Sequence, residues 1–205
     1  MSKIVCLSAG AALIGLLAGA PVAAQEAITV FGQSLLDQCS NAAANAQRLG
    51  KADFLDLQVC SDAIGRSWST EGEIATAYRN RGAMRLARGE PGRALADFTA
   101  AIKADPAYAA AYNDRGVAYS ALHHSAEATR DYTRALALRP ENPDQILFNR
   151  AMAYEDQGDL ERAYQDYRQA ADLNPGWDLP AQQLARFTVA PRPSESGRFR
   201  PNMGQ

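Results

Sequence analysis

Apolar and small side chains recur through the middle of the chain at the spacing of α-helices. Tyr112, Gly116 and Tyr119 fall at i, i+4 and i+7, so they share one helix face. A polar turn over residues 123–125 follows, and residues 128–135 then carry a second apolar stripe. This segment is therefore predicted to form two helices joined by a short turn.

The two-helix pattern occurs three times with a nearly constant period. One landmark, a small residue within the first helix, recurs after 34 and then 35 residues, at Gly82, Gly116 and Ala151. A second landmark, an alanine followed four places later by an aromatic residue, keeps the same period, in the pairs Ala94 and Phe98, Ala128 and Tyr132, and Ala163 and Tyr167. Each unit closes with a residue that cannot continue a helix, at Pro106, Pro140 and Pro175. Two landmarks with one period indicate a repeat architecture.

Glycine at the small position is informative because glycine within a helix costs about 1 kcal/mol relative to alanine. Its recurrence at Gly82 and Gly116 indicates that another helix passes close by. We expect the aromatic residues of the second helices to fill the remaining space.

These landmarks resemble the tetratricopeptide repeat, whose motif has small residues at positions 8, 20 and 27, aromatic residues at 11 and 24, and proline at 32. The second and third units contain this set, whereas the first has Arg85 where the aromatic residue at position 11 is expected. The resemblance implies an all-α fold, a right-handed superhelical array of helix-turn-helix repeats. The repeats would cover residues 75–108, 109–142 and 143–177.

The segments on either side of the repeats are predicted to close the array. Residues 34–70 are predicted to form a divergent helical hairpin, because Cys60–Ile64 follows the pattern of residues 98–102. Residues 178–189 are predicted to form a capping helix, since an array exposes an apolar face unless its last unit is covered. Prolines and glycines predict a disordered tail over residues 190–205.

The N-terminus has the three parts of a secretory signal peptide. A basic start precedes an uncharged apolar run over residues 4–20, and Val22 and Ala24 are small residues of the kind that precede cleavage. The run is shorter than the ~20 apolar residues that span a bilayer comfortably. We therefore predict a cleaved signal peptide over residues 1–24, a flexible mature start over residues 25–33, and a periplasmic or secreted protein of the bacterial envelope. An uncleaved anchor is the alternative.

Two cysteines remain once Cys6 leaves with the signal peptide. Cys39 and Cys60 fall on the two helices of the N-terminal hairpin, and an even count in an oxidising compartment favours a disulfide between them. The chain-entropy model assigns about 3 kcal/mol to a loop of this length. A pair of buried free thiols is the alternative.

The charge of the chain argues against two classes of partner. Lysine and arginine total 21, against 23 aspartate and glutamate residues, which gives a net charge of −2. This balance provides neither the basic surface of a nucleic-acid-binding protein nor a polybasic segment for anionic lipid.

An arginine recurs at position 7 of each repeat, and an aspartate follows it sixteen residues later. We expect a structural ion pair between the two helices of each repeat, in the pairs Arg81 and Asp97, Arg115 and Asp131, and Arg150 and Asp166. The alternative is solvated charges, since exposed ion pairs contribute only ~0–1 kcal/mol.

The resemblance also implies a binding surface for a partner protein. In tetratricopeptide repeats the first helix of each repeat lines a concave groove, and the residues at those positions here include Arg79, Asn80, Ala83, Asn113, Asp114, Val117, Phe148, Asn149 and Met152. Amide side chains donate and accept hydrogen bonds, so they suit the backbone of an extended peptide. Asp114 and the lack of lysine argue against the clamp with which one subclass of the family holds a terminal carboxylate. A solvated surface, or a groove filled by the chain's own termini, is the alternative.

The sequence does not indicate catalysis. His123 and His124 lie in a turn without accompanying cysteine or carboxylate ligands, so no metal is expected. No phosphate loop, nucleophile elbow or zinc-protease motif is found, so no cofactor is expected and an enzyme is the least favoured interpretation. The predicted function is a scaffold or adaptor that binds a peptide or helix of a partner protein. Homo-oligomerisation through the caps and Trp177 is the alternative.

Overall fold

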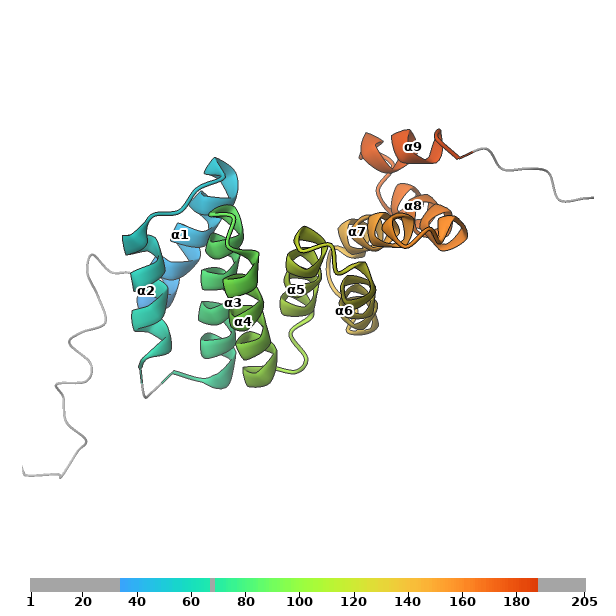
Figure 1. Cartoon of the computed structure of the whole chain (residues 1–205). Helices are drawn as coiled ribbons and strands as arrows, with labels where there is room; N and C mark the ends of the chain where they lie inside the picture. Colours follow the sequence, from blue (N-terminus) through green and yellow to red (C-terminus); the bar gives the residue numbers. More distant parts are fainter. Residues whose placement is uncertain (1–33, 67–68, 188–205) are drawn as a thin grey trace, which may run out of the picture. The chain divides into compact units, whose positions relative to one another are not determined.

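The computed structural model describes residues 34–66 and 69–187, and all regular secondary structure within them is α-helical (Figure 1). The helices are α1 (Leu35–Leu49), α2 (Phe54–Ile64), α3 (Glu71–Ala87), α4 (Pro91–Ala104), α5 (Ala109–Ala121), α6 (Ser125–Ala137), α7 (Pro143–Asp156), α8 (Leu160–Leu173) and α9 (Asp178–Leu184). The predicted signal peptide, flexible start and disordered tail lie outside the described residues. The prediction of an all-α fold is confirmed.

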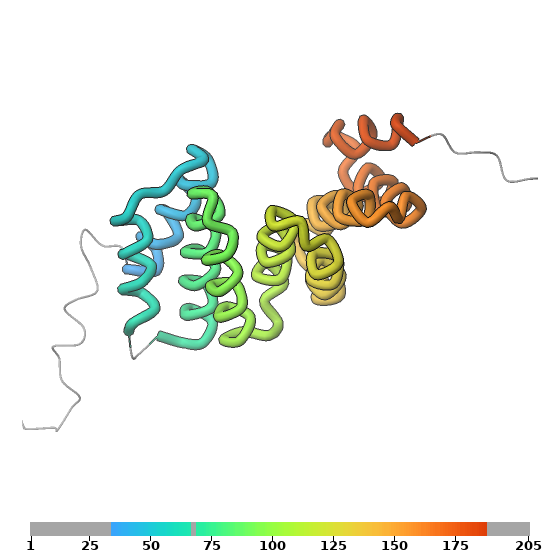
Figure 2. Tube along the Cα trace, viewed as in Figure 1, coloured from blue at the N-terminus to red at the C-terminus, as the bar shows by residue number. Residues whose placement is uncertain are grey.

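Consecutive helices pack as hairpins, and the chain turns back between them (Figure 2). The hairpins are α1 with α2, α3 with α4, α5 with α6, and α7 with α8. The second helix of one hairpin also packs against the first helix of the next, as α4 does against α5 and α6 against α7. All of these helices belong to one compact unit that begins at Leu35. Units that contact mainly their neighbours are typical of a repeat protein.

Capping groups and prolines fix where several helices begin. The hydroxyl of Thr70 accepts a hydrogen bond from the backbone N–H of Glu73, and the Glu73 carboxylate accepts one from the backbone N–H of Thr70. This capping box satisfies N–H groups that have no partner within the helix. Helices α4 and α7 begin at Pro91 and Pro143, where a missing N–H costs nothing.

The turns within the repeats place one residue in the left-handed region. Gly89 and Gly158 have φ values of 72° and 76°, and His123, which has the same repeat position, has a φ of 61°. Glycine adopts this conformation readily, and histidine is among the other residues that are enriched there. The backbone conformation of the turn therefore explains the presence of a histidine at residue 123 without a role in metal binding.

The core of each repeat is an aromatic ring of the second helix packed against a small residue of the first. A Cβ added to Gly82 would lie 2.6 Å from the ring of Phe98, and one added to Gly116 would lie 2.6 Å from the ring of Tyr132. Both rings are buried. In the third repeat Ala151 packs with Tyr167, so the helices there leave room for one methyl group.

The two ends of the array are closed in different ways. Cys39 and Cys60 form a disulfide between α1 and α2, with an S–S distance of 1.98 Å, and both residues are fully buried. Cys60 has the repeat position of the core aromatic residue, so the disulfide replaces the contact between ring and small residue. At the other end, Leu184 and Phe187 of the α9 region pack against the core around Tyr167.

Candidate functional site

Each arginine at position 7 binds the aspartate sixteen residues later through two N–H···O hydrogen bonds. The pairs are Arg81 with Asp97, Arg115 with Asp131, and Arg150 with Asp166, at N–O distances of 2.7–3.1 Å. Bidentate geometry of this kind is stronger and more directional than a single contact. The aspartate side chains are 4–9% exposed, so these carboxylates belong to the structure of the repeats rather than to a binding surface.

The remaining guanidinium nitrogen, Nη1, donates a hydrogen bond to a hydroxyl of the preceding hairpin. The donor and acceptor residues are Arg81 and Ser61 at 3.0 Å, Arg115 and Thr99 at 3.4 Å, and Arg150 and Thr133 at 3.1 Å. Each hydroxyl residue directly follows Cys60 or a core aromatic residue. One arginine therefore connects three helices. The third repeat has Arg168 at the hydroxyl position, and its side chain is 68% exposed.

Arg85, which departs from the repeat motif, contacts the first of these carboxylates. Its Nη1 lies 2.8 Å from Oδ2 of Asp97, so Asp97 is paired with two arginines. In the other repeats this position holds Tyr119 or Tyr154. The departure from the motif therefore adds a charge partner to a buried carboxylate.

The N-terminal hairpin covers part of the surface that the family resemblance assigns to binding. Helix α1 packs against α3, and Nδ2 of Asn80 donates to Oγ of Ser40 at 3.0 Å. Asn80 is only 8% exposed and Ala83 only 7%. The prediction that these two residues line an open groove is therefore wrong, because α1 occupies the space in front of them.

Phe148 is not a free anchor either. Its ring centroid lies 4.9 Å from that of Trp177 and 5.3 Å from that of Tyr167. Trp177 immediately precedes α9, so the chain's own C-terminal cap covers Phe148.

The other predicted groove residues keep exposed surface. The half-buried ones are Arg79, Asn113, Asp114, Val117 and Asn149, and Met152 is 49% exposed. Nε of Arg79 donates to Oδ2 of Asp114 at 2.7 Å, so these two residues join α3 to α5. The sequence placed both in the groove without indicating that they pair.

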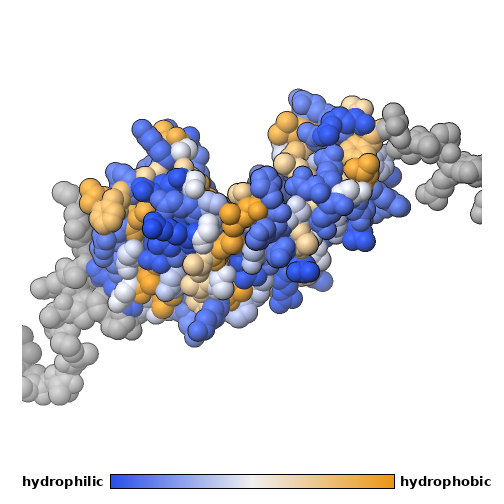
Figure 3. Space-filling model, viewed as in Figure 1, coloured by the Kyte–Doolittle hydropathy of each residue, from blue (hydrophilic) through white to orange (hydrophobic). Residues whose placement is uncertain are grey.

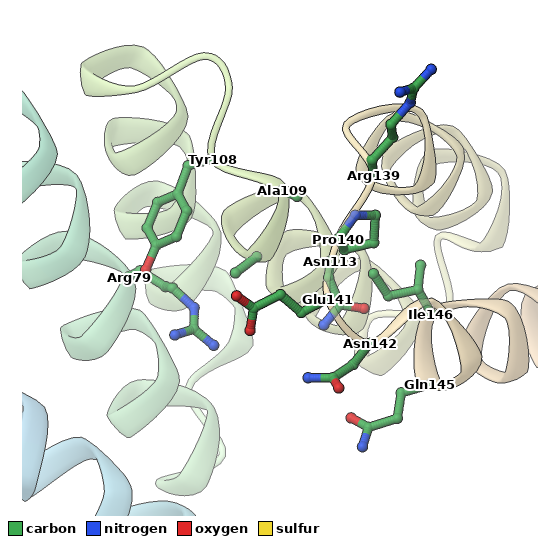
Figure 4. Close-up of a pocket in the computed structure, with 11 residues that line it drawn as sticks. Arg79, Tyr108, Ala109, Asn113, Arg139, Pro140, Glu141, Asn142, Gln145 and Ile146 are labelled. Atoms are coloured by element: carbon green, nitrogen blue, oxygen red, sulfur yellow. The ribbon is translucent and has the colours of Figure 1, made fainter. Parts of the chain in front are cut away.

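Arg79 also lines a hollow of about 470 Å³, which we call the amide hollow (Figure 4). Its walls come from α3, the start of α5, the loop over residues 139–142 and the start of α7, and its polar lining includes Arg79, Tyr108, Asn113, Glu141, Asn142 and Gln145. In Figure 4 the side chain of Glu141 points into the space between these walls, whereas that of Arg139 points away. The hollow unites Arg79 and Asn113 but not Asn149 or Met152. Sequence reasoning missed Tyr108, Glu141 and Asn142 because they lie in loops, to which the family positions do not extend.

Two polar groups at the amide hollow are costly to bury. Nδ2 of Asn113 donates to Oδ1 of Asp114 at 3.1 Å, but Oδ1 of Asn113 is buried and has no hydrogen-bond partner in the described part of the chain. A buried acceptor without a donor costs ~1–3 kcal/mol. Burial also raises the pKa of Asp114, although the charge of Arg79 acts in the opposite direction.

Residues 34–66 and 69–187 contain no cluster of three or more His, Cys, Asp or Glu side chains that could hold a metal ion. No helix within these ranges combines the length and the hydropathy that a membrane crossing requires.

Helical hairpins that pack on their neighbours, with an aromatic ring against a small residue in each repeat, define an α-helical repeat protein. A family model described as tetratricopeptide repeat matches residues 109–142, and a second model with the same description matches residues 145–176. Residues 109–142 and 145–176 are therefore tetratricopeptide repeats, as the sequence predicts.

Similar proteins support this assignment of the fold. Sperm-associated antigen 1 of Mus musculus is 27% identical over 135 residues, which are 66% of this chain but only 15% of that protein. The Arabidopsis OM64 TPR domain superposes with a TM-score of 0.54 at 23% identity and covers 57% of this chain and 95% of its own. The second TPR domain of human RPAP3, in complex with the HSP70 peptide SGPTIEEVD, has a TM-score of 0.52 at 29% identity and covers 54% of this chain and 92% of its own.

Proposed function

We propose that this chain is a non-catalytic scaffold that binds an extended segment of a partner protein at the amide hollow. The observation that carries the proposal is the group of amide side chains, Asn113, Asn142 and Gln145, that lines this one hollow. A polypeptide backbone offers an N–H donor at every residue except proline. Asn142 and Gln145 line the same hollow, and their amides can pair with backbone N–H and C=O groups alike.

The comparisons support a protein ligand without naming it. The RPAP3 domain, at 29% identity, is a repeat array of the same family in complex with a peptide. Because one fold hosts many partners, the ligand of this chain has to follow from its own residues. Trp177, which the oligomer alternative uses, packs on Phe148 within the chain and is half-buried.

We also propose that the scaffold works in the bacterial envelope, as a periplasmic or secreted protein. The signal-peptide pattern of residues 1–24 supports this location. The disulfide between Cys39 and Cys60 supports it independently, since disulfides persist mainly in oxidising compartments. Expression in a bacterium followed by fractionation and intact-mass measurement provides the test. We expect a periplasmic product that begins at Gln25, and a cytoplasmic product that keeps Met1 would refute the location.

Selection from a displayed library of random peptides tests the binding function. We expect the purified chain to enrich peptides, and the Asn113→Ala/Gln145→Ala variant to bind them at least tenfold more weakly. Gln165→Ala, an exposed amide on α8, is the matched control and should leave binding unchanged. No enrichment, or equal binding by the double variant, would contradict the proposal.

A further inference from the structure

A second hollow, of about 410 Å³, adjoins the amide hollow and shares the side chain of Tyr108 with it. Its lining includes Glu73 of α3 and Asp105 of the loop after α4, and we call it the acidic hollow. Leu36 of α1 and Thr76 of α3 complete its walls. An extended ligand that crosses Tyr108 would therefore contact both hollows.

The charges of the acidic hollow are not balanced by its own lining. Glu73 and Asp105 face it, and its lining contains no lysine or arginine. Hydrogen bonds from the backbone N–H and the hydroxyl of Thr70 lower the pKa of Glu73, so this carboxylate stays ionised at neutral pH. Oδ1 of Asp105 accepts a hydrogen bond from the backbone N–H of Ala107, which fixes the carboxylate without neutralising it.

The amide hollow is also negatively charged when the ion pair between Arg79 and Asp114 is set aside. Arg79 is paired with Asp114 at 2.7 Å, and the side chain of Arg139 points away from the hollow (Figure 4). Glu141 points inward in the same view, and none of the salt bridges among the described residues involves it. Asn113 adds a buried oxygen without a donor. The carboxylates that line the two hollows without a basic side-chain partner are thus Glu73, Asp105 and Glu141.

We infer that the partner segment is cationic. Its lysine or arginine side chains lie beside Glu73 and Asp105 on one side of Tyr108 and beside Glu141 on the other, and its backbone pairs with the side-chain amides that line the amide hollow. This inference rests on the proposed function, because it assumes that an extended peptide occupies the hollows. The ring of Tyr108 already carries the guanidinium of Arg79, 5.9 Å from its centroid, so the carboxylates are the groups that select a cationic side chain. The face shown in Figure 3 is largely polar, with apolar residues in small groups.

Fluorescence anisotropy with a matched set of labelled peptides tests the charge of the ligand. The peptides share one length and one alanine-rich sequence and carry lysine, glutamine or glutamate at the same alternate positions. We expect the full chain to bind the lysine peptide about tenfold more tightly than the glutamine peptide, because each of several exposed ion pairs contributes ~0.2–1 kcal/mol. The glutamate peptide should bind most weakly. The preference for lysine should shrink when salt is raised from about 0.01 to 0.15 M.

The double substitution Glu73→Gln/Glu141→Gln removes two of the charges with little change of shape. Glutamine at residue 73 can still complete the capping box, so α3 should begin at the same residue, which far-UV circular dichroism checks. We expect the preference for lysine over glutamine to fall about fivefold, in keeping with the loss of two exposed ion pairs. Glu161→Gln on α8, an exposed carboxylate outside both hollows, is the control and should keep the full preference.

The possible outcomes separate the two proposals. If none of the peptides binds either the parent chain or the arginine-substituted variant described below, both the charge inference and the proposed function are overturned. If the three peptides bind alike, or if the preference survives in the double variant, the cationic ligand is refuted and peptide binding stands. If the chain binds the lysine peptide only after Arg192, Arg198 and Arg200 are replaced by glutamine, the occupant is the chain's own C-terminal segment, which contradicts a partner protein as the ligand.

Discussion

Ser61 accepts a hydrogen bond from Nη1 of Arg81 at 3.0 Å. Thr99 and Thr133 accept the equivalent bond from the arginines of the next two repeats. Ser61 belongs to α2, so the second helix of the N-terminal hairpin stands where a preceding repeat would place its own second helix. The divergent hairpin is therefore joined to the array through the same polar contact that joins the repeats to one another.

The first prediction concerns the central ion pair. Asp131→Asn should lower the free energy of unfolding by about 2–3 kcal/mol, because it leaves the largely buried guanidinium of Arg115 without its charged acceptor. Thr99→Val removes only the longer, exposed hydrogen bond and should cost about 0.5 kcal/mol. Urea unfolding measures both values. Asp172→Asn, which alters an exposed pair at 4.0 Å, is the control and should change stability by less than about 0.5 kcal/mol. Equal losses in Asp131→Asn and Asp172→Asn would show that the pair is merely solvated charge.

The second prediction concerns the small residue under the core ring. Gly116→Ala gains about 1 kcal/mol of helix propensity but forces a methyl group against the ring of Tyr132, 2.6 Å away. Overpacking of a buried site costs ~1–3 kcal/mol, so we expect a net loss of about 1 kcal/mol in thermal or urea unfolding. Gly92→Ala, in α4 with no atom within 4 Å of the new Cβ, should instead stabilise the chain by up to about 1 kcal/mol. A stabilising effect at both positions would contradict the proposed packing.

The third prediction concerns the disulfide. Cys39→Ala/Cys60→Ala should lower the free energy of unfolding by about 3 kcal/mol, the chain-entropy value for a bond that spans 21 residues. A reducing agent should destabilise the parent chain by a similar amount and leave the double variant unchanged. Since α1 covers Asn80, hydrogen exchange of α3 should also increase. Identical unfolding midpoints with and without reductant would rule out a stabilising bond.

The fourth prediction concerns alkaline pH. Burial is the main cause that raises the pKa of Tyr132 from 10.0 to about 12. A group whose pKa is raised by folding contributes stability that is complete below the unfolded pKa and is lost as pH rises to the folded pKa. The parent chain should therefore lose more stability between pH 10 and 12 than Tyr132→Phe, which has no proton to release. Urea unfolding at several pH values gives the change of unfolding free energy with pH for both proteins. Equal changes in the two would mean that the ring of Tyr132 is not buried as described.

The repeats of this molecule could be predicted from its sequence because their landmark residues recur with a nearly constant period. Gly116 and Tyr132 have equivalents one repeat away in each direction, so their contact is repeated and leaves a pattern. Contacts that occur only once in the molecule were harder to predict. Nothing in the periodic pattern shows that Ser40 binds Asn80, because Ser40 lies in the divergent hairpin. Trp177 has the repeat position of Tyr108 and Asn142, and the differing residue types there do not indicate that it covers Phe148.

The candidate site was predicted only in part for a related reason. Arg79 and Asn113 lie on first helices, where the family resemblance assigns binding positions. Glu141 and Tyr108 lie in connections between hairpins, and their role depends on how neighbouring hairpins are spaced. That spacing follows from packing across the units rather than from any one segment.

Arg168 occupies the place of Ser61, Thr99 and Thr133 in the last repeat, and it cannot accept a hydrogen bond. A designed chain with another unit grafted after residue 173 would therefore bring two guanidinium groups together at the new junction. Changing residue 168 to threonine should restore a hydrogen-bond acceptor at that junction and so favour the graft.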